Sequence, residues 1–429
     1  MGSVEEGSGS IFLRSAQMLA RRFYSTLTLA AKYTQMDTQR RMDTQNGLFG
    51  SPGLISQQPP AAMLLRSSTV FLLLLCFYHS GSAIVVADND YGGVPLWVDR
   101  LLGEPSVLSL QGRLDSAWFR ANNPQTCPQQ CDCPIQWPTA LYCDHRGLAE
   151  IPQTLPNRTE YLFLQDNNIT SLSSAVLANN TGLRWMILDH NLLGSRELAA
   201  AALQQQSKLC YLFANHNHLT SVPRGLPAGL RQLRLAHNQI SSISPGAFKN
   251  LHNLTVLLLQ GNRLKTIKEE DFLGLVSLNL LHLGGNSLSS VPSHLPSSVQ
   301  QLYLSNNSLS KVDSDSFQGL LQLKYLRLSQ CGLKSGEIKP WAFNISSLIE
   351  LDLSHNKLTS VPTVPTTLLY LYLEANDIQE VNMTSFCREV GPVSYSRIKV
   401  LRLDGNKLSH HQLPPDWYFC LRVLESIYI

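Results

Sequence analysis

Between residues 159 and 408, leucine recurs with the same internal spacing in a series of short segments. The segments LRQLRLAHNQI (230–240), LTVLLLQGNRL (254–264), LNLLHLGGNSL (278–288) and LIELDLSHNKL (348–358) fit one pattern, L-x-x-L-x-L-x-x-N-x-L. Eleven copies occur, at steps of 20 to 30 residues. The ninth position of the successive copies is occupied by Asn167, Asn191, Asn217, Asn238, Asn262, Asn286, Asn307, Cys331, Asn356, Asn376 and Asn406.

This spacing predicts one short strand in each copy. Leucines at positions 1, 4, 6 and 11 point inward and stack on those of neighbouring copies, because no copy buries its apolar face alone. The chain turns sharply after each strand, and the ninth-position amide can bond the backbone groups that the turn leaves unpaired. The pattern is the leucine-rich repeat. It predicts an α/β-type solenoid, a horseshoe of about eleven repeats with a curved parallel sheet on its concave face.

An apolar segment that begins at Met63 indicates the compartment. It reads MLLRSSTVFLLLLCFYHSGSA, with one arginine, an apolar block and small residues at its end. This is the pattern of a secretory signal peptide over 63–83 with cleavage after Ala83, because a transmembrane helix needs roughly 20 apolar residues. Residues 1–62 are then an upstream extension that we expect to be disordered. A mitochondrial transit sequence in their acid-poor part is the alternative.

Removal of residues 1–83 changes the charge of the chain. It takes away seven of the 34 basic and four of the 31 acidic side chains and leaves 27 of each. A neutral mature chain gives no electrostatic case for binding nucleic acid or an anionic membrane. Eight of the nine cysteines remain. In an oxidising compartment they favour disulfides over a metal site.

The two ends of a solenoid expose apolar side chains and an unpaired strand edge, so they need caps. The cluster from Cys127 to Cys143 precedes the first repeat and predicts a disulfide-stapled cap, with a zinc site that includes His145 as the alternative. Cys387 and Cys420 flank the longest, final repeat. The mature chain then divides into a variable tail (84–126), an N-terminal cap (127–143), the repeats (144–386) and a C-terminal cap (387–429).

Two further cysteines fall within the repeats. Cys331 replaces the ninth-position Asn, and we interpret it as a buried structural thiol, with a redox role as the alternative. Cys210 lies at the second position of its copy, near the strand surface. Its state is left open.

Three features together are similar to a known family. They are the C-x3-C-x-C-x9-C spacing, the segment PTALYCDHRGLAEIP, and repeats in short and long steps that end in a cysteine-bounded long repeat. Over residues 127–429 the chain resembles the small leucine-rich proteoglycans, and within them the keratan sulfate group. The resemblance implies the disulfides Cys127–Cys133, Cys131–Cys143 and Cys387–Cys420, whereas the residues alone leave three pairings of the first four cysteines open.

The same family often has a sulfated, tyrosine-rich acidic tail, for which this chain offers only Tyr91, in the segment DNDY. Ser335 begins the one Ser-Gly pair of the mature chain. It is a candidate for a chondroitin-type chain, with a simple turn as the alternative.

Seven N-x-S/T sequons are usable if the chain is secreted. They lie at Asn157, Asn168, Asn179, Asn253, Asn306, Asn344 and Asn382. The resemblance implies that Asn179, Asn253 and Asn344 carry the glycans, keratan sulfate among them.

The non-leucine positions of each strand face away from the leucine core. Positions 3 and 5 carry many aromatic and arginine side chains, which is typical of a binding surface; the alternative is that strand propensity alone enriches the rings. Phe163, in the first copy, is expected to contribute little to binding. The residues expected to contact fibrillar collagen are Tyr303, Arg327, Asp352, Tyr372, Arg402 and Asp404. Ser305 stands where related proteins carry an acid.

Four histidines, His190, His216, His237 and His355, share the eighth position. Too few carboxylates accompany them for a metal site, so we interpret them as solvated residues at the edge of the sheet. No metal and no cofactor is expected.

Two functions of different classes fit the chain. The first is a secreted extracellular-matrix proteoglycan core that binds fibrillar collagen through its concave face and regulates fibril assembly. The second is a soluble recognition module for microbial ligands or growth factors, since one solenoid serves many partners. An enzyme has no support, because no G-x-S-x-G, H-E-x-x-H or phosphate-loop motif occurs. A homodimer through the concave face is left open.

Overall fold

The computed structural model describes residues 126–134, 137–196, 198, 203–388, 395–415 and 417–429. All of them belong to one structural unit, Val86–Ile429. The expected upstream extension, the signal peptide, nearly all of the variable tail and the sulfation candidate Tyr91 lie outside the described residues.

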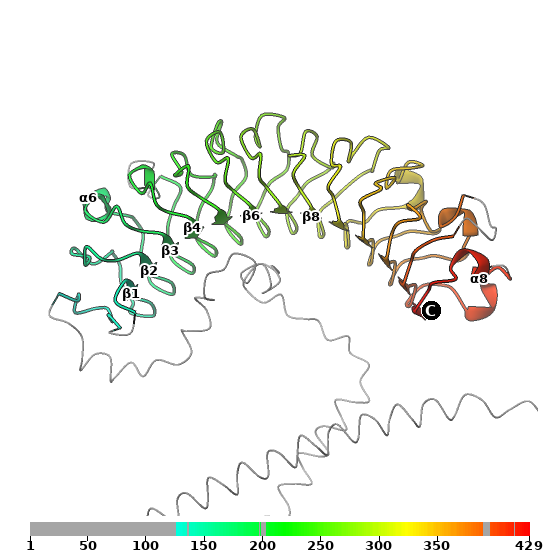
Figure 1. The fold of residues 1–429 in the computed structure, drawn as a ribbon, viewed down its shortest axis with the longest axis horizontal. Helices are drawn as coiled ribbons and strands as arrows, with labels where there is room; N and C mark the ends of the chain where they lie inside the picture. Colours follow the sequence, from blue (N-terminus) through cyan, green and yellow to red (C-terminus); the bar gives the residue numbers. More distant parts are fainter. Residues whose placement is uncertain (1–125, 135–136, 197, 199–202, 389–394, 416) are drawn as a thin grey trace, which may run out of the picture. The chain divides into compact units, whose positions relative to one another are not determined.

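The described residues form one parallel sheet of thirteen strands whose order follows the chain. Figure 1 shows the strands along the inner side of an arc and the loops along its outer side. The strands are β1 (Ala140–Tyr142), β2 (Tyr161–Phe163), β3 (Trp185–Ile187), β4 (Tyr211–Phe213), β5 (Gln232–Arg234), β6 (Val256–Leu258), β7 (Leu280–His282), β8 (Gln301–Tyr303), β9 (Tyr325–Arg327), β10 (Glu350–Asp352), β11 (Tyr370–Tyr372), β12 (Val400–Arg402) and β13 (Ser426–Tyr428). The predicted leucine-rich repeat horseshoe is confirmed.

The loops contain little helix. The helical segments that lie wholly within the described residues are α6 (Ser174–Ala178), α8 (Trp417–Cys420) and the 3-10 turns η2 (Ser335–Glu337), η3 (Met383–Ser385) and η4 (His410–Gln412). No helix among the described residues is long and apolar enough to cross a bilayer.

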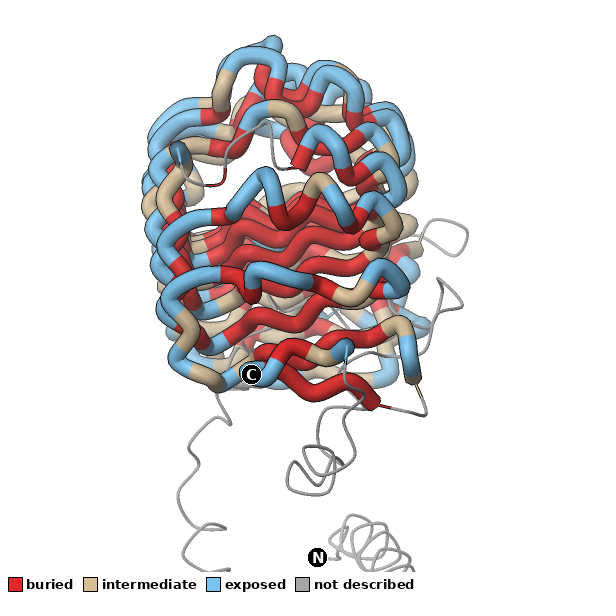
Figure 2. The backbone as a smooth tube through the Cα atoms, turned by 90° about the vertical axis from the view of Figure 1, so that its left-hand side faces the viewer, coloured by how far each residue is buried: buried red, intermediate tan, exposed pale blue. Residues whose placement is uncertain are grey.

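The leucines of the repeats form the core. Strands pair in register, so that Leu281 lies between Leu257 and Leu302 of the neighbouring strands. In the same repeat Leu278, Leu281 and Leu283 are fully buried, and each such side chain contributes about 1.5–3 kcal/mol of hydrophobic stabilisation. Figure 2 shows the buried strands inside and the exposed loops around them.

The ninth-position asparagines bond the backbone of each turn, as predicted. Asn262 is representative. Its Nδ2 donates to the carbonyls of Leu235 (2.9 Å), Leu259 (3.0 Å) and Gln260 (3.3 Å), and its Oδ1 accepts from the amide of Ile240 at 2.9 Å. One side chain therefore satisfies backbone groups of two successive repeats, which the turn would otherwise leave buried and unpaired.

The eighth position has a left-handed backbone in every repeat, which the leucine pattern did not reveal. Asn, Asp, His and Gly tolerate this conformation best, and they occupy most of these positions. The eleven residues, with φ between 51° and 72°, are Asp166, His190, His216, His237, Gly261, Gly285, Asn306, Gln330, His355, Ala375 and Gly405. The four histidines noted in the sequence therefore share this position because of the turn.

Two strands extend the sheet beyond the eleven repeats. β1 lies in the N-terminal cap and pairs with β2, and β13 pairs with β12 at the other end. Beside β1, the guanidinium of Arg146 forms an ion pair with the carboxylate of Asp132. The disulfides near the two ends are Cys127–Cys133, Cys131–Cys143 and Cys387–Cys420, the pairs that the resemblance implies.

Cys331 lies in the asparagine ladder and is 4 % exposed. Its Sγ donates to the carbonyls of Leu304 at 3.3 Å and Ser329 at 3.5 Å. A thiol has no oxygen to accept from the preceding repeat. The amide of Leu309, which corresponds to that of Ile240, accordingly has no acceptor among the described residues.

Replacement of the thiol by the amide of the other repeats should stabilise the fold. We expect Cys331→Asn to raise the free energy of unfolding by about 1 kcal/mol, the net contribution of one buried hydrogen bond, because the Asn Oδ1 can accept from the Leu309 amide. Urea denaturation followed by circular dichroism measures the change. Cys331→Ala is the control, since it removes the thiol without supplying an acceptor and should destabilise. A destabilised Cys331→Asn would show that the ladder tolerates only sulfur there.

Candidate functional site on the concave face

The N-terminal half of the concave face is packed, which corrects one expectation. Its rings were predicted to form a free binding surface, yet Phe163 is 0 % exposed. Trp185 stacks on Tyr211 with centroids 3.9 Å apart, and Tyr142 on Phe163 at 4.5 Å. Strands lie only about 4.8 Å apart, so rings on successive strands pack against one another. The buried cluster comprises Ala140, Tyr142, Phe163, Trp185, Ile187, Tyr211 and Phe213.

Phe163 is therefore a packing residue. Truncation to alanine would remove a stacked ring from this cluster, so loss of stability is its expected effect. The expectation that Phe163 contributes little to collagen binding stays a prediction.

The C-terminal half of the concave face is more open. Arg327 is exposed, and Asp352, Tyr372, Arg402 and Asp404 are half-buried. These five predicted collagen contacts lie on or directly after β9 to β12, so the structure brings them together on four successive strands.

Tyr303, the sixth predicted contact, is buried at 5 % exposure. Its hydroxyl donates to Gln301 Oε1 at 2.9 Å. The guanidinium carbon of Arg327 lies 4.9 Å from the centre of its ring. Tyr303 thus supports Arg327 from below and presents little surface of its own.

Two arginines on this half are held by carboxylates. Arg327 Nε and Nη2 contact Glu350 Oε1 at 3.0 and 2.9 Å. Arg402 binds Asp404 through two bonds of 3.0 and 2.7 Å and lies 3.4 Å from Glu374. Both side chains are therefore fixed in place before any partner arrives.

Asp352 differs from the other carboxylates of this face. Its Oδ1 accepts from the amide and the hydroxyl of Ser354 at 2.9 and 2.6 Å, and no cation of the described chain forms an ion pair with it. Four carboxylates accompany two guanidinium groups here: Glu350, Asp352, Glu374 and Asp404 beside Arg327 and Arg402. The open half therefore has an excess of negative charge.

Environment shifts several pKa values on this face. Burial raises the pKa of Tyr372, so its phenol stays protonated and can donate a hydrogen bond at neutral pH. The hydrogen bond from Arg402 lowers the pKa of Asp404 and keeps that carboxylate charged. Burial raises the pKa of Glu374, which favours its neutral form more than for an exposed glutamate.

Three histidines form a column at the edge of the sheet. The rings of His190, His216 and His237 are parallel, with centroids 4.2 and 4.5 Å apart. Asp189 lies beside them and accepts from the amide of Asn215 at 2.7 Å, and burial raises the pKa of Asp189 to about 6. Within the described residues, no group of three or more His, Cys, Asp or Glu could hold a metal ion.

A polar cavity of about 410 Å³, here termed the polar notch, opens at the ends of β5 to β10. Its lining includes Gln260, His282, Ser305, Asn306, Arg327 and Asp352. The sequence placed His282 on the concave face but assigned it no role, and it did not single out Gln260. The consecutive glycines 284 and 285 were the available signal, because they remove side-chain volume from two adjacent positions.

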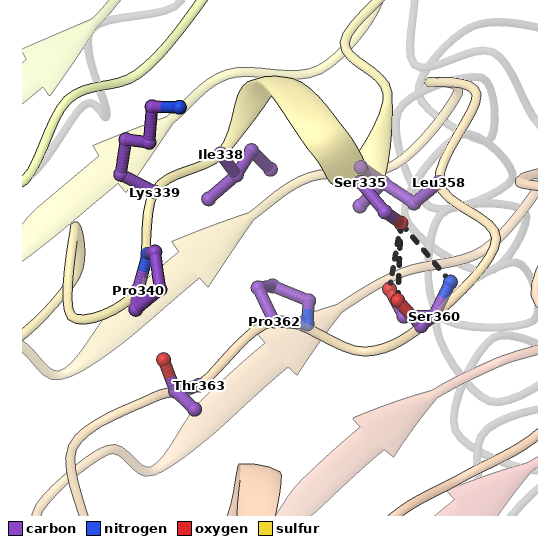
Figure 3. Close-up of a pocket in the computed structure, with 8 residues that line it drawn as sticks. All are labelled: Ser335, Ile338, Lys339, Pro340, Leu358, Ser360, Pro362 and Thr363. Atoms are coloured by element: carbon purple, nitrogen blue, oxygen red, sulfur yellow. Dashed lines mark hydrogen bonds between the residues drawn. The ribbon is translucent and has the colours of Figure 1, made fainter.

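A smaller cavity of about 180 Å³ lies among the loops that follow β9 and β10 (Figure 3). Ser335 lines it and bridges two repeats, since its Oγ accepts from the amides of Thr359 and Ser360 at 3.0 and 3.1 Å. Ser195 makes the same bridge to the amide of Thr220 at 2.8 Å. These bonds favour the interpretation of Ser335 as a turn residue over a chondroitin attachment site.

The sequon asparagines are all exposed. Asn179, Asn253 and Asn344 lie in the loops before β3, β6 and β10, off the concave face. Asn306 lies at the polar notch, and Asn382 caps η3 with its side chain.

The repeats, the asparagine ladder and the disulfide-linked ends define a leucine-rich repeat solenoid protein. Models of the leucine rich repeat match residues 228–288, 290–333 and 347–366, and a model of the leucine rich repeat N-terminal domain matches residues 126–156.

Solved structures show the same fold. A chain in the octameric complex of latrophilin 3, Unc5D and FLRT2 is similar with a TM-score of 0.56 and 26 % identity, over 70 % of this chain and 83 % of that one. For the TLR13–ssRNA13 complex the TM-score is 0.53 at 23 % identity, over 63 % and 39 %; this likeness concerns the fold alone.

Curated relatives narrow the class to a family. Rat (Rattus norvegicus) lumican is 41 % identical over 75 % of this chain and 97 % of its own length. Human (Homo sapiens) lumican is 43 % identical over 70 % and 88 %, and human fibromodulin 42 % over 72 % and 81 %. The chain belongs to the small leucine-rich proteoglycans, as a lumican-like member of that family.

The two free cysteines should differ in reactivity. Cys331 is buried, and burial raises the pKa of its thiol to about 11, so little of the nucleophilic thiolate forms at pH 8. Cys210 is only half-buried. We expect iodoacetamide to label Cys210 first and Cys331 only after denaturation, as read by mass spectrometry of peptides. Equal labelling rates under native conditions would contradict the placement of Cys331 in the ladder.

Proposed function

We propose that this protein is a secreted extracellular-matrix proteoglycan core that binds fibrillar collagen and regulates fibril assembly. The observation that carries the proposal is the contrast between the two halves of the concave face. The N-terminal half is filled with packed rings, whereas the C-terminal half presents partly exposed charges from β9 to β12. Membership of the lumican-like proteoglycans and disulfides near both ends support secretion.

The chemistry of the open half suits a collagen triple helix. The three chains of collagen are extended at about 3.1 Å per residue, so charged side chains recur along a narrow rod. The excess of carboxylates favours contact with lysine and arginine side chains on that rod. Asp352 is the strongest candidate, because its carboxylate bonds the amide and hydroxyl of Ser354 and forms no ion pair within the described residues.

Five of the six residues expected from the sequence remain proposed collagen contacts, and Tyr303 takes a supporting role. Asp352, Asp404, Arg327, Arg402 and Tyr372 form the contact surface. Tyr303 acts beneath Arg327, through the ring contact at 4.9 Å. Ser305 lies beside Ser329, whose hydroxyl donates to Ser305 Oγ at 2.8 Å, so this position offers a hydroxyl where the family resemblance implies an acid.

A soluble recognition module is the second candidate. It is supported by the likeness to a chain in a multi-protein complex of latrophilin 3, Unc5D and FLRT2. A partner such as a growth factor would use the same open half. Competition between that partner and collagen for the parent protein distinguishes shared from separate surfaces.

We further propose that Asn179, Asn253 and Asn344 carry N-linked chains, keratan sulfate among them. All three are exposed in loops before strands. A bulky glycan there projects from the outer side of the solenoid and leaves the concave face accessible.

Removal of two charges from the open half should weaken collagen binding. We expect Asp352→Asn with Asp404→Asn to cost about 1–2 kcal/mol, or roughly 5- to 30-fold in Kd, because both changes keep side-chain shape and remove only charge. Surface-resonance titration on fibrillar collagen at two salt concentrations measures the effect, and the variant should be less sensitive to salt.

The matched control is Asp377→Asn. Asp377 pairs with Lys407 at 2.8 Å outside the strands, so its change should leave binding unaltered. Unchanged affinity of the double variant, with an intact circular dichroism spectrum, would move the collagen site off the open half.

Removal of three sequons should show that collagen binding does not require their glycans. Asn179→Gln, Asn253→Gln and Asn344→Gln together should remove most of the glycan mass, while secretion and collagen binding persist, because the loops lie off the concave face. Intact-mass spectrometry and collagen pull-down give the two readouts, with Asn382→Gln alone as the control. If binding disappeared while the fold remained, the glycan would be the contact and the concave-face proposal would fail.

A further inference from the structure

Gln260 lines the polar notch, and the polar atoms of its side chain form no hydrogen bonds within the described residues. The residue follows β6 and is 6 % exposed, and neither its Oε1 nor its Nε2 has a partner among the described residues. A buried amide without hydrogen bonds costs about 1–3 kcal/mol. Such a group at the wall of a cavity indicates that a ligand or solvent supplies the missing partners.

His282, on the neighbouring strand β7, adds a donor to the same wall. Its Nδ1 accepts from the amide of Gly284 at 3.2 Å, which places the proton of the neutral ring on Nε2. Burial lowers the pKa of His282 to about 3, so the ring stays neutral at physiological pH. The ring edge packs against Tyr303 at 5.2 Å between centroids, which fixes its direction.

The glycines keep the notch open. A Cβ at residue 284 would lie 2.9 Å from His282 Cε1 and 3.0 Å from the carbonyl oxygen of Ser305. At Gly261, with φ +65°, it would lie 2.5 Å from Nδ1 of His237. The cavity of about 410 Å³ lies within the roughly 300–1,000 Å³ range of small-ligand sites.

The charges of the notch disfavour an anion. Arg327 is the cation of its lining, and two short contacts commit it to Glu350. Asp352 adds a negative charge at the same wall. What the remaining lining offers is a mixture of donors and acceptors: the Gln260 and Asn306 amides, the His282 N–H and the Ser305 hydroxyl. Vicinal hydroxyl groups, each of which both donates and accepts, complement such a set.

We propose that the polar notch binds a neutral saccharide unit, with the amide of Gln260 and Nε2–H of His282 bonding adjacent hydroxyl groups. This site goes beyond the collagen proposal and does not depend on it. The saccharide unit could belong to either of two molecules, which offer the same hydroxyl groups. One is a glycan on Asn306 of the same chain, since Asn306 lies in the lining, and the other is a saccharide on another molecule.

The test compares two sugars that differ by one charge. Saturation-transfer NMR with methyl β-glucoside should show binding with a Kd on the order of 1 mM, as expected for a ligand of this size. The protein that binds is the secreted parent or, where the chain's own glycan fills the notch, its Ser308→Ala variant, which lacks the sequon at Asn306. Methyl β-glucuronide should bind at least fivefold more weakly, because its carboxylate meets Asp352.

Two variants and one matched control place the site. Gln260→Leu and His282→Phe each keep side-chain size and should weaken methyl β-glucoside binding at least fivefold. Gln165→Leu changes the same residue type at the same pattern position in the first repeat, also buried, and should have no effect. Thermal melting shows whether each variant folds. If Gln260→Leu does not fold, His282→Phe tests the site alone.

A further arm identifies the source. If the notch holds the chain's own glycan, methyl β-glucoside binds only after Ser308→Ala, which removes the sequon and leaves the Asn306 amide in the lining. If the notch takes an external saccharide, the parent binds equally well. Both results support a saccharide site. Binding that is unchanged in Gln260→Leu and His282→Phe, a preference for the glucuronide, or no binding in parent and Ser308→Ala alike would overturn the proposal.

Discussion

The structure depends on how each repeat satisfies the backbone groups of its turn. A strand of three residues followed by a sharp reversal would bury amides and carbonyls without partners, and the ninth-position amide removes that cost for two repeats at once. Asn238, for example, bonds the carbonyls of Ala214, Leu235 and Ala236 at 2.9–3.1 Å and accepts from the Leu219 amide at 3.0 Å. The leucine core stabilises the fold through hydrophobic burial. The asparagine ladder supplies the hydrogen bonds without which the chain could not reverse after each strand, and it therefore sets the strand direction and the concave face.

Most of the fold could be predicted because leucine and asparagine positions encode local requirements that repeat. The eleven strands β2 to β12, the inward leucines and the buried Cys331 followed from that pattern. β1 and β13 were missed, although Leu141 and Ile427 stand where a repeat has its second leucine, because single copies at a chain end give no period. The left-handed backbone at the eighth position was not predicted, because several residue types adopt it and no single residue marks it in the sequence.

The site was less predictable, because it depends on contacts between repeats. Sequence position shows that Phe163 and Arg327 occupy equivalent places on the concave face. It does not show that one is covered by stacked rings while the other stays exposed above Tyr303. That outcome depends on whether neighbouring strands supply rings or charges. The balance between Arg327, Glu350 and Asp352 likewise appears only when the strands are placed side by side.

The two kinds of site proposed for the concave face follow from the same constraint. Leucines and ladder asparagines are needed for the core and the turns, and Cys331 is the one replacement in the ladder. Specificity therefore has to come from positions 3, 5, 7 and 8. Charged side chains at position 5 create a raised surface suited to a rod. Glycines at positions 7 and 8, as at Gly284 and Gly285, lower the surface locally and expose the polar atoms of neighbours such as Gln260. A cavity formed by missing side chains carries no motif, which is why its ligand must be inferred from the donors and acceptors that it leaves open.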